Sequence, residues 1–270
     1  MSTVRTHFND AVEYLASEDA KREITLLFRS LLNCTLLDWS AELTDNQIKS
    51  LNQMVAKRRQ GVPLSHILGK RAFWKSEFVV TSDVLDPRPD TETLVETALA
   101  LSEPKKILEL GVGSGALIQS LLLEWPSASG VGTDISKEAL AVAKQNAINL
   151  GVSNRLELIE TDWFKGVRGR FDLIVSNPPY ISMDEYKKLD KELSFEPKIA
   201  LTDDADGLSA YRTIAANFKN YLTPNGVLLL EIGHNQASLV KEIFSDQGHD
   251  DMKILKDING KDRVVKVKPN

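Results

Sequence analysis

The run Asn177-Pro178-Pro179-Tyr180 has the chemical groups needed to bind a neutral NH2 group. It follows the apolar run 171–175, which is typical of a buried strand, so it is expected at a strand's carboxyl end, where open α/β sheets bind ligands. The two prolines fix φ and remove two N–H donors, which leaves carbonyl groups as acceptors. The Asn177 side chain adds an acceptor and Tyr180 adds a flat ring, so the run suits a planar amide or amine. Taken by itself, the run could also be a rigid turn.

A glycine-rich turn precedes this run in the chain. Residues 109–115 read Glu-Leu-Gly-Val-Gly-Ser-Gly and lie between a predicted strand, 106–110, and a predicted helix, 115–124. Glycines at such a place let the backbone turn sharply and let a ligand approach closely. Asp134 ends the next predicted strand, where an acidic side chain can bind ribose hydroxyls or simply cap the following helix. The pair predicts a nucleoside site.

The glycine turn alone leaves two kinds of nucleoside open. Gly111, Gly113 and Ala116 also satisfy the dinucleotide fingerprint, which would make the protein a dehydrogenase. Against this, Glu109 places a carboxylate beside the turn, which would repel a pyrophosphate and favour a cationic sulfonium or ammonium group. The chain also has no clear second mononucleotide-binding half.

The order of predicted elements indicates an α/β fold. Residues 1–70 are expected to be helical, residues 71–90 a hairpin connector, and residues 91–270 a domain in which strands and helices alternate. Such alternation predicts a mainly parallel sheet with helices on both faces. The last two strand-like runs, 253–255 and 263–267, are joined by a short segment and should pair antiparallel.

Composition narrows the class of protein. Of the 270 residues, 42% are hydrophobic and 26% charged, which is ordinary for a soluble globular protein. No apolar run approaches the ~20 residues of a membrane span, and the N-terminus lacks the features of a signal peptide. The single cysteine, Cys34, is expected in the core of a protein of the reducing cytosol. One cysteine and four scattered histidines predict no metal site.

Charge is unevenly distributed along the chain. The net charge is −5; residues 1–75 carry 11 Lys/Arg and 8 Asp/Glu, a net of +3, and the remainder carries −8. A net negative charge argues against a nucleic-acid substrate. The weakly basic front end could meet an acidic partner, although the cluster Lys57-Arg58-Arg59 by itself is better explained as an ordinary solvated face.

With the glycine turn, Asp134 and the 177–180 run in this order, the sequence resembles the class I S-adenosylmethionine-dependent methyltransferases. More narrowly, it resembles the release factor glutamine methyltransferases (the PrmC/HemK family). The likeness extends over nearly the whole chain from residue 60 and includes the runs 87–92, 196–197, 206–208 and 230–233. Asp86 departs from the family pattern, because an aliphatic residue is usual before Pro-Arg-Pro.

The resemblance implies a Rossmann-like, mainly parallel seven-stranded sheet with an antiparallel last strand, and a small N-terminal helical domain for substrate recognition. It implies methyl transfer from S-adenosylmethionine to the side-chain amide of the glutamine in the Gly-Gly-Gln loop of class I peptide-chain release factors. Further expectations are a cytoplasmic monomer with no membrane attachment and no stable binding to nucleic acid. By position, the cofactor would be bound by Glu109, Gly111, Val112, Gly113, Ser114, Gly115, Asp134, Trp163 and Asn177. Substrate binding would fall to Asn177, Pro178, Pro179 and Tyr180, with Asn177, Pro178 and Tyr180 catalytic.

The chemistry of these groups suggests a mechanism. An amide nitrogen is a poor nucleophile because its lone pair is shared with the carbonyl group. We expect Asn177 Oδ1 and the Pro178 carbonyl to accept the two substrate N–H bonds while Tyr180 stacks on the amide plane, with no general base. Trp163 would pack on adenine, or else fill the core. Alternatives are a methyltransferase for base amino groups of DNA or RNA, and a non-catalytic module that kept the cofactor pocket.

Overall fold

The computed structural model describes residues 3–269, which form two compact units. One unit comprises the chain up to Gly69 together with Asp190–Phe195, and the other comprises Lys70–Leu189 and the chain from Glu196 onward. The inclusion of Asp190–Phe195 in the first unit could not be read from the sequence.

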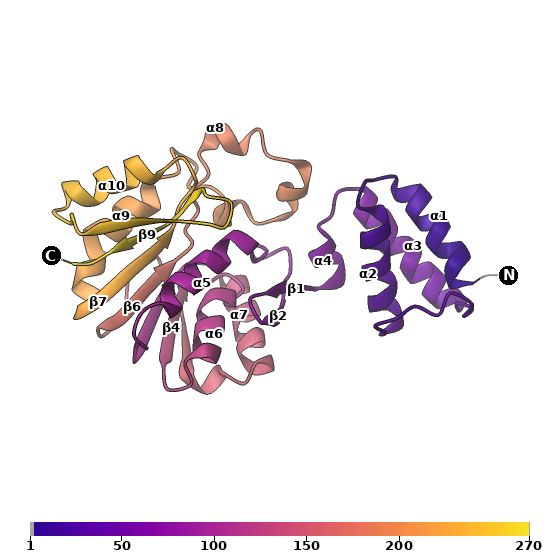
Figure 1. Cartoon of the computed structure of the whole chain (residues 1–270), viewed down its shortest axis with the longest axis horizontal. Coiled ribbons are helices and arrows are strands. Elements are labelled where there is room, and N and C mark those ends of the chain that lie inside the picture. Colours follow the sequence, from indigo (N-terminus) through magenta and orange to yellow (C-terminus); the bar gives the residue numbers. More distant parts are fainter. Residues whose placement is uncertain (1–2, 270) are drawn as a thin grey trace. The chain divides into compact units, whose positions relative to one another are not determined.

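The first unit is helical, as predicted. It contains α1 (Val4–Leu15), α2 (Ala20–Leu32), α3 (Asp45–Arg59) and α4 (Leu64–Leu68) (Figure 1). Helices α1 and α3 begin at Thr3 and Thr44, whose hydroxyls accept a backbone N–H of the first turn in capping boxes. The apolar faces of α1, α2 and α3 pack into one core. The Arg58 guanidinium pairs with the buried Glu23 carboxylate at 2.9 Å and with Glu192 at 3.4 Å, which ties the short segment after residue 189 to this unit.

The second unit contains a hairpin and a seven-stranded sheet. The hairpin strands are β1 (Lys70–Phe73) and β2 (Ser76–Val79). The order in the large sheet is β5-β4-β3-β6-β7-β9-β8. Only β9 runs against the others, so the predicted antiparallel last strand is confirmed, as is its pairing with β8. The bounds are β3 (Lys106–Leu110), β4 (Ser129–Asp134), β5 (Leu156–Glu160), β6 (Phe171–Ser176), β7 (Leu222–Glu231), β8 (Met252–Lys256) and β9 (Asp262–Val267).

Helices cover both faces of this sheet because side chains alternate along each strand. Ile107 points into the core under α5 (Glu92–Leu99), α6 (Ala116–Glu124) and α7 (Lys137–Asn149), whereas Leu108 points into the core under α9 (Ser209–Asn217) and α10 (Ala237–Asp246). Figure 1 shows these two groups of helices on opposite sides of the sheet. The remaining elements are α8 (Met183–Tyr186) and the 3-10 turns η1 (Pro89–Thr91), η2 (Ser153–Arg155), η3 (Lys191–Phe195), η4 (Lys198–Ala200) and η5 (Phe218–Tyr221).

The topology brings the predicted functional runs to one edge. The strand order changes direction between β3 and β6, and ligands of open α/β sheets bind at such a switch point. In the sheet register, Leu110 of β3 lies beside Ser176 of β6, and Ser176 lies beside Leu230 of β7. The Ser176 hydroxyl donates to the Leu110 carbonyl at 2.7 Å. The glycine turn, the 177–180 run and Glu231 therefore leave neighbouring strands at the same edge.

The described residues contain neither a helix suited to span a membrane nor a cluster suited to hold a metal ion. Within residues 3–269, no helix is both long and apolar enough to cross a membrane. Nor does that part of the chain gather three or more His, Cys, Asp or Glu side chains in an arrangement that could hold a metal ion.

Candidate active site

A cavity of about 300 Å³ opens at the carboxyl ends of β3, β4 and β6. Its volume lies at the lower end of the range for small-molecule sites. The glycine turn and the ends of three strands line it, together with the connector before α5 and the loop before α9. From these segments the lining includes Asp86, Arg88, Thr91, Glu109, Gly111, Val112, Gly113, Ser114, Asp134, Ile135, Asp162, Trp163, Asn177, Pro179, Ile199, Thr202, Asp203 and Ser209.

The glycine turn leaves open space on the side of the cavity. Gly111 and Gly113 have φ of +71° and +52°, a region in which side chains are rare, and a Cβ added at either would meet no atom within 4 Å. Two backbone hydrogen bonds fix the turn: Val112 N donates to the Thr133 carbonyl at 2.8 Å, and Gly113 N donates to Asp134 Oδ2 at 2.9 Å. The backbone is thus held so that a ligand can approach it closely.

Two carboxyl groups face the cavity beside this turn. Asp134 accepts Gly113 N on one oxygen and Ser136 N, at 3.0 Å, on the other, and each oxygen retains a lone pair for a ribose hydroxyl. Glu109 is buried and accepts Ile118 N at 3.0 Å. Burial raises the pKa of Glu109 well above its ordinary value, the bond from Ile118 opposes that rise, and the Asp134 charge adds to it. A cationic ligand group next to Glu109 would favour its ionised form.

Trp163 lies on the cavity wall beyond β5. Its φ of +52° places a bulky residue in the left-handed region, and its ring is half-buried against the core cluster under α9 and α10. The ring packs on the core, which is one of its two predicted roles, and also lines the cavity, whereas its contact with adenine stays a prediction. A flat apolar face beside Asp134 fits the adenine of a nucleoside.

At the end of β6, Asn177 is half-buried and lines the cavity. Its Nδ2 donates to the Thr91 hydroxyl at 3.1 Å. Tyr180, three residues later, donates its hydroxyl to Glu231 at 3.3 Å. Pro179 lines the cavity, but Pro178 and Tyr180 do not appear among its described lining residues. Burial raises the pKa of the Tyr180 hydroxyl, which stays a donor.

Glu231 is a fully buried carboxyl group behind Asn177. Burial raises its pKa to about 7, while the nearby Thr91 and Tyr180 hydroxyls and the positive charge of Arg263 oppose the rise. Arg263 is itself held by Asp90 at 2.8 Å and Asp257 at 3.1 Å. This side of the site is therefore a buried polar network that titrates near neutral pH.

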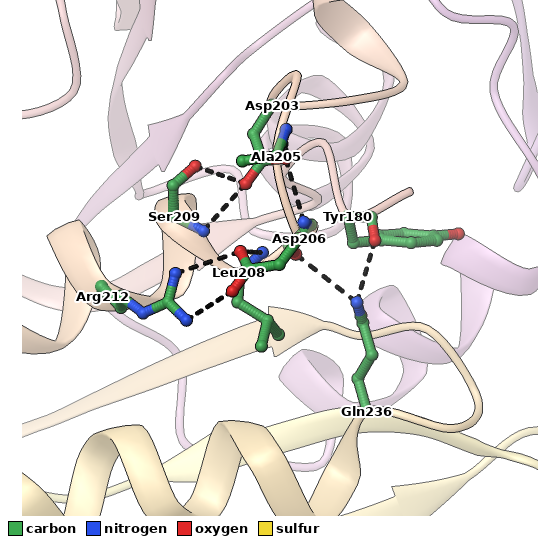
Figure 2. Close-up of polar contacts among 9 residues, drawn as sticks. Tyr180, Asp203, Ala205, Asp206, Leu208, Ser209, Arg212 and Gln236 are labelled. Atoms are coloured by element: carbon green, nitrogen blue, oxygen red, sulfur yellow. Dashed lines mark hydrogen bonds and ion pairs between the residues drawn. The ribbon is translucent and has the colours of Figure 1, made fainter. Parts of the chain in front are cut away.

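A loop before α9 supports the 177–180 run from the other side. The Asp203 carboxylate accepts the backbone N–H groups of Ala205, Gly207 and Ser209 at 2.9–3.0 Å, and the Ser209 hydroxyl at 2.6 Å (Figure 2). Burial raises the pKa of Asp203, but the bonds from Ser209, Ala205 and Gly207 outweigh it and lower the pKa to about 2. The Asp203 carboxylate therefore folds this loop and begins α9.

The loop before α9 is joined to the 177–180 run by the Gln236 side chain and by a backbone hydrogen bond. Gln236 Nε2 donates to the Tyr180 carbonyl at 2.9 Å and to the Gly207 carbonyl at 3.4 Å (Figure 2). Ile181 N also donates to the Leu201 carbonyl at 3.0 Å. Gly207 has φ of +76°, and a Cβ there would lie 2.3 Å from the Tyr180 carbonyl oxygen, so only glycine permits this approach.

The connector before α5 forms another wall of the cavity. Arg88 pairs with the buried Glu196 at 2.6 Å, and Glu196 also accepts Asp86 N at 3.3 Å. Burial raises the pKa of Glu196, Arg88 opposes the rise, and the charge of Asp86 adds to it. Asp86, which departs from the family pattern, is only 3% exposed and lies in this wall.

The structure brings most of the residues singled out from sequence into one cavity. Gly115 instead forms the N-cap of α6, with φ of +79°. Sequence reasoning gave no specific role to Thr91 and Asp203 and left open whether Glu231 is only structural. The available signals were their positions, since Thr91 follows Pro-Arg-Pro-Asp and Glu231 ends an apolar strand.

Comparison with known proteins adds independent information. Residues 71–205 match the methyltransferase small domain family, and residues 7–69 match the PrmC N-terminal domain. A release factor glutamine methyltransferase of Cereibacter sphaeroides is 48% identical over 213 residues, which are 78% of this chain and 76% of that protein. A bifunctional methyltransferase of Rickettsia felis is 36% identical over 297 residues, which cover 97% of this chain and 56% of that longer protein. The crystal structure of a Pyrococcus furiosus methyltransferase shares the fold, with a TM-score of 0.56 at 16% identity over 83% of this chain and 98% of that one.

Proposed function

Because this chain belongs to the release factor glutamine methyltransferases, we propose that it methylates the glutamine of the Gly-Gly-Gln loop in class I peptide-chain release factors. The methyl group is transferred from S-adenosylmethionine to the side-chain amide nitrogen, which tunes translation termination. One observation carries the proposal: Asn177, whose side-chain carbonyl can accept an N–H of an amide, lines the same cavity as the glycine turn and Asp134, which suit a nucleoside.

The residues of the cavity fit this cofactor. S-adenosylmethionine, when bound, supplies a methyl group already activated on a sulfonium. The open turn at Gly111 and Gly113 would receive its methionine part, Asp134 would accept the ribose hydroxyls, and Trp163 would lie against adenine. Burial raises the pKa of Glu109, and a positive sulfonium beside it would favour its ionised form.

The 177–180 run would hold the substrate amide. Asn177 Oδ1 accepts one N–H of the glutamine, the Pro178 carbonyl accepts the other, and Tyr180 stacks on the amide plane. Pro178 and Tyr180 alternate along the turn with the cavity-lining residues Asn177 and Pro179. Positive charge develops on the nitrogen as the methyl group is transferred, so these acceptors bind the transition state more strongly than the ground state. The methylated amide cation then loses a proton readily, and no general base is needed.

The helical unit is proposed to recognise the release factor, with residues 1–70 as the recognition domain, 71–90 as the connector and 91–270 as the catalytic domain. The net charge of +3 on residues 1–75 suits an acidic surface. We also propose a cytoplasmic monomer that forms no stable complex with nucleic acid, because release factors act on ribosomes and one chain supplies the whole cavity. Light scattering of a monomer would give a mass near 30.0 kDa.

A labelling assay tests the proposed reaction. The protein is mixed with methyl-labelled S-adenosylmethionine and, in parallel, with a class I release factor, the same factor with the loop glutamine replaced by glutamate, and DNA and RNA. Label on the intact factor alone, at the glutamine by mass spectrometry, is the expected result. Label on a nucleic-acid base, or equal label on the glutamate variant, would contradict the proposal.

A further inference from the structure

Gln236, the residue before α10, joins three segments of the second unit through its half-buried side-chain amide. Its Nε2 donates to the carbonyl groups of Tyr180, at 2.9 Å, and Gly207, at 3.4 Å (Figure 2). Its Oε1 accepts Gly233 N at 3.0 Å. The 177–180 run, the loop before α9 and the segment after β7 therefore meet at one side chain, which is not among the described residues that line the cavity.

The partners of Gln236 determine the orientation of its amide. The carbonyl oxygens of Tyr180 and Gly207 only accept hydrogen bonds, so the NH2 group must face them. Gly233 N only donates, so Oε1 must face Gly233. Reversing the amide would place an oxygen against two oxygens and an NH2 group against an N–H, which would leave no favourable contact. Both protons of the Gln236 NH2 group are therefore bound by the two carbonyl groups.

The 177–180 run is held at both of its ends. At its start it continues β6, which pairs with parallel strands on both sides. At its far end, Gln236 binds the Tyr180 carbonyl. The two prolines between these ends have a fixed φ and no N–H, so the run is stiff and forms few backbone hydrogen bonds of its own. The bond at the far end therefore helps to set where Asn177 and the Pro178 carbonyl lie.

We propose that Gln236 is a positioning residue for methyl transfer. By binding the Tyr180 carbonyl, it holds the 177–180 run where Asn177 Oδ1 and the Pro178 carbonyl accept the substrate N–H groups. The inference rests on the proposed function, because these acceptors serve an amide substrate. Gln236 acts through the run and touches neither cofactor nor substrate. A displacement of about 1 Å at the reacting groups can cost about 100-fold in rate, so a contact behind the site can control turnover.

One variant separates this role from a local structural role of the same side chain. The bond between Oε1 and Gly233 N belongs to the turn that begins α10, where Gln236 N also donates to the Gly233 carbonyl at 2.9 Å. Gln236→Glu keeps an oxygen for Gly233 N but places a carboxylate oxygen against the carbonyl groups of Tyr180 and Gly207. The variant therefore preserves the turn and makes only the contacts with the run and the loop repulsive.

Kinetics of matched variants test the inference with a class I release factor as substrate. Gln236→Glu should lower kcat about 10- to 100-fold. Gln236→Met, which removes the hydrogen bonds without adding repulsion, should lower kcat by a smaller factor. In both variants the Kd for S-adenosylhomocysteine, measured by calorimetry, should change less than about threefold, because the glycine turn and Asp134 are untouched. The matched control is Gln145→Glu on α7, since the exposed Gln145 amide donates to Asn149 Oδ1 at 2.8 Å and should leave kcat unchanged.

A spectroscopic readout tests the same contacts without any substrate. The ¹H–¹⁵N signals of the Gln236 side-chain NH2 are identified by their absence in Gln236→Met. They should exchange with solvent at least about tenfold more slowly than the signals of the exposed Gln145, because both Gln236 protons are bound. Gly207→Ala should speed their exchange, since its Cβ displaces the loop from the Tyr180 carbonyl.

Two results would overturn the inference by kinetics: wild-type kcat in Gln236→Glu, or a fall in kcat that is matched by an equal fall in affinity for S-adenosylhomocysteine. Gln236 signals that exchange as fast as those of Gln145 would overturn it by spectroscopy. Slow exchange of the Gln236 signals in a wild-type protein that labels no release factor would instead refute the proposed function and leave Gln236 as the residue that holds the run.

Discussion

Two carboxylates are linked to the 177–180 run, one through the loop before α9 and the other through the Tyr180 hydroxyl, and their environments differ. Asp203 lies on a partly solvated loop and accepts four hydrogen bonds, which lower its pKa to about 2 (Figure 2). Glu231 is fully buried, and burial raises its pKa to about 7. The Asp203 carboxylate is permanently charged and stabilises one loop conformation, whereas ionisation of the buried Glu231 carboxyl group is unfavourable in free energy.

The difference separates a folding role from a functional role. Asp203 satisfies the backbone of its loop, and the loop presses Gly207 against the Tyr180 carbonyl. Glu231 gains less from its neighbours than it loses by burial, which is the pattern expected of a group retained for function. Each variant below changes one of these two carboxylates, or the contacts that link it to the 177–180 run.

The largest effect is expected from replacing Asn177, in the 177–180 run to which both carboxylates are linked. Asn177→Ala removes the substrate acceptor and should lower kcat by about 10²- to 10³-fold, the range for losing one transition-state hydrogen bond. Cofactor affinity, measured by calorimetry, should stay within a few fold, because the glycine turn and Asp134 are untouched. Turnover near that of the wild type would refute the role given to Asn177.

The next largest effect should come from disrupting the contact between Gly207, in the Asp203 loop, and the Tyr180 carbonyl. Gly207→Ala adds a Cβ 2.3 Å from the Tyr180 carbonyl oxygen and a left-handed side chain, so we expect a loss of ~2–4 kcal/mol in the free energy of unfolding together with reduced turnover. Gly166→Ala is the matched control, since Gly166 also has positive φ but open space around it, and should cost only ~1 kcal/mol. Equal losses in urea denaturation of the two variants would show that the contact with Tyr180 is unimportant.

Glu231 should make the protein less stable as pH rises. Its folded pKa of about 7 lies above its ordinary value of 4.5, so its contribution to stability is fully present below about pH 4.5 and is lost as pH rises through 7. Glu231→Gln removes this penalty and should raise the free energy of unfolding by ~1–3 kcal/mol near pH 8, with no gain near pH 4.5. A variant less stable than the wild type at pH 8 would show that Glu231 is a stabilising charge.

Asp203 should show the opposite dependence on pH. Its folded pKa of about 2 lies below its ordinary value of 3.8, so its contribution is present above about pH 3.8 and is lost as pH falls through 2. Asp203→Asn should cost ~1 kcal/mol near pH 7, a small value because solvent screens this partly exposed group. The cost should shrink in urea titrations toward pH 2. A cost independent of pH would assign the effect to lost packing.

The sequence predicted the framework of the fold because local patterns encode it. Strand 106–110 was placed at its observed bounds and helix 115–124 within one residue of them, and the final antiparallel pair followed from a short connection that permits no crossover. Helix α9 begins at Ser209, where the Asp203 carboxylate accepts the Ser209 N–H, and the chain continues after it as the 3-10 turn η5. No apolar periodicity records such a contact.

The sequence pointed to site residues only where a single short segment contains the chemical groups concerned. The glycine turn, Asp134 and Asn177 each stand directly after a strand, so chain order alone places them at one edge. Thr91 is 86 residues from Asn177, and their contact depends on how the connector lies across the sheet, which no spacing rule encodes. The raised pKa of Glu231 likewise depends on its burial, a property of the packed structure.

A crystal structure with S-adenosylhomocysteine and a peptide containing Gly-Gly-Gln would test the central claim most directly. The account predicts the glutamine side-chain nitrogen within ~3 Å of Asn177 Oδ1, with Asn177 Nδ2 still on the Thr91 hydroxyl. A glutamine amide held by other residues, or an Asn177 side chain turned away from Thr91 and from the peptide, would contradict it.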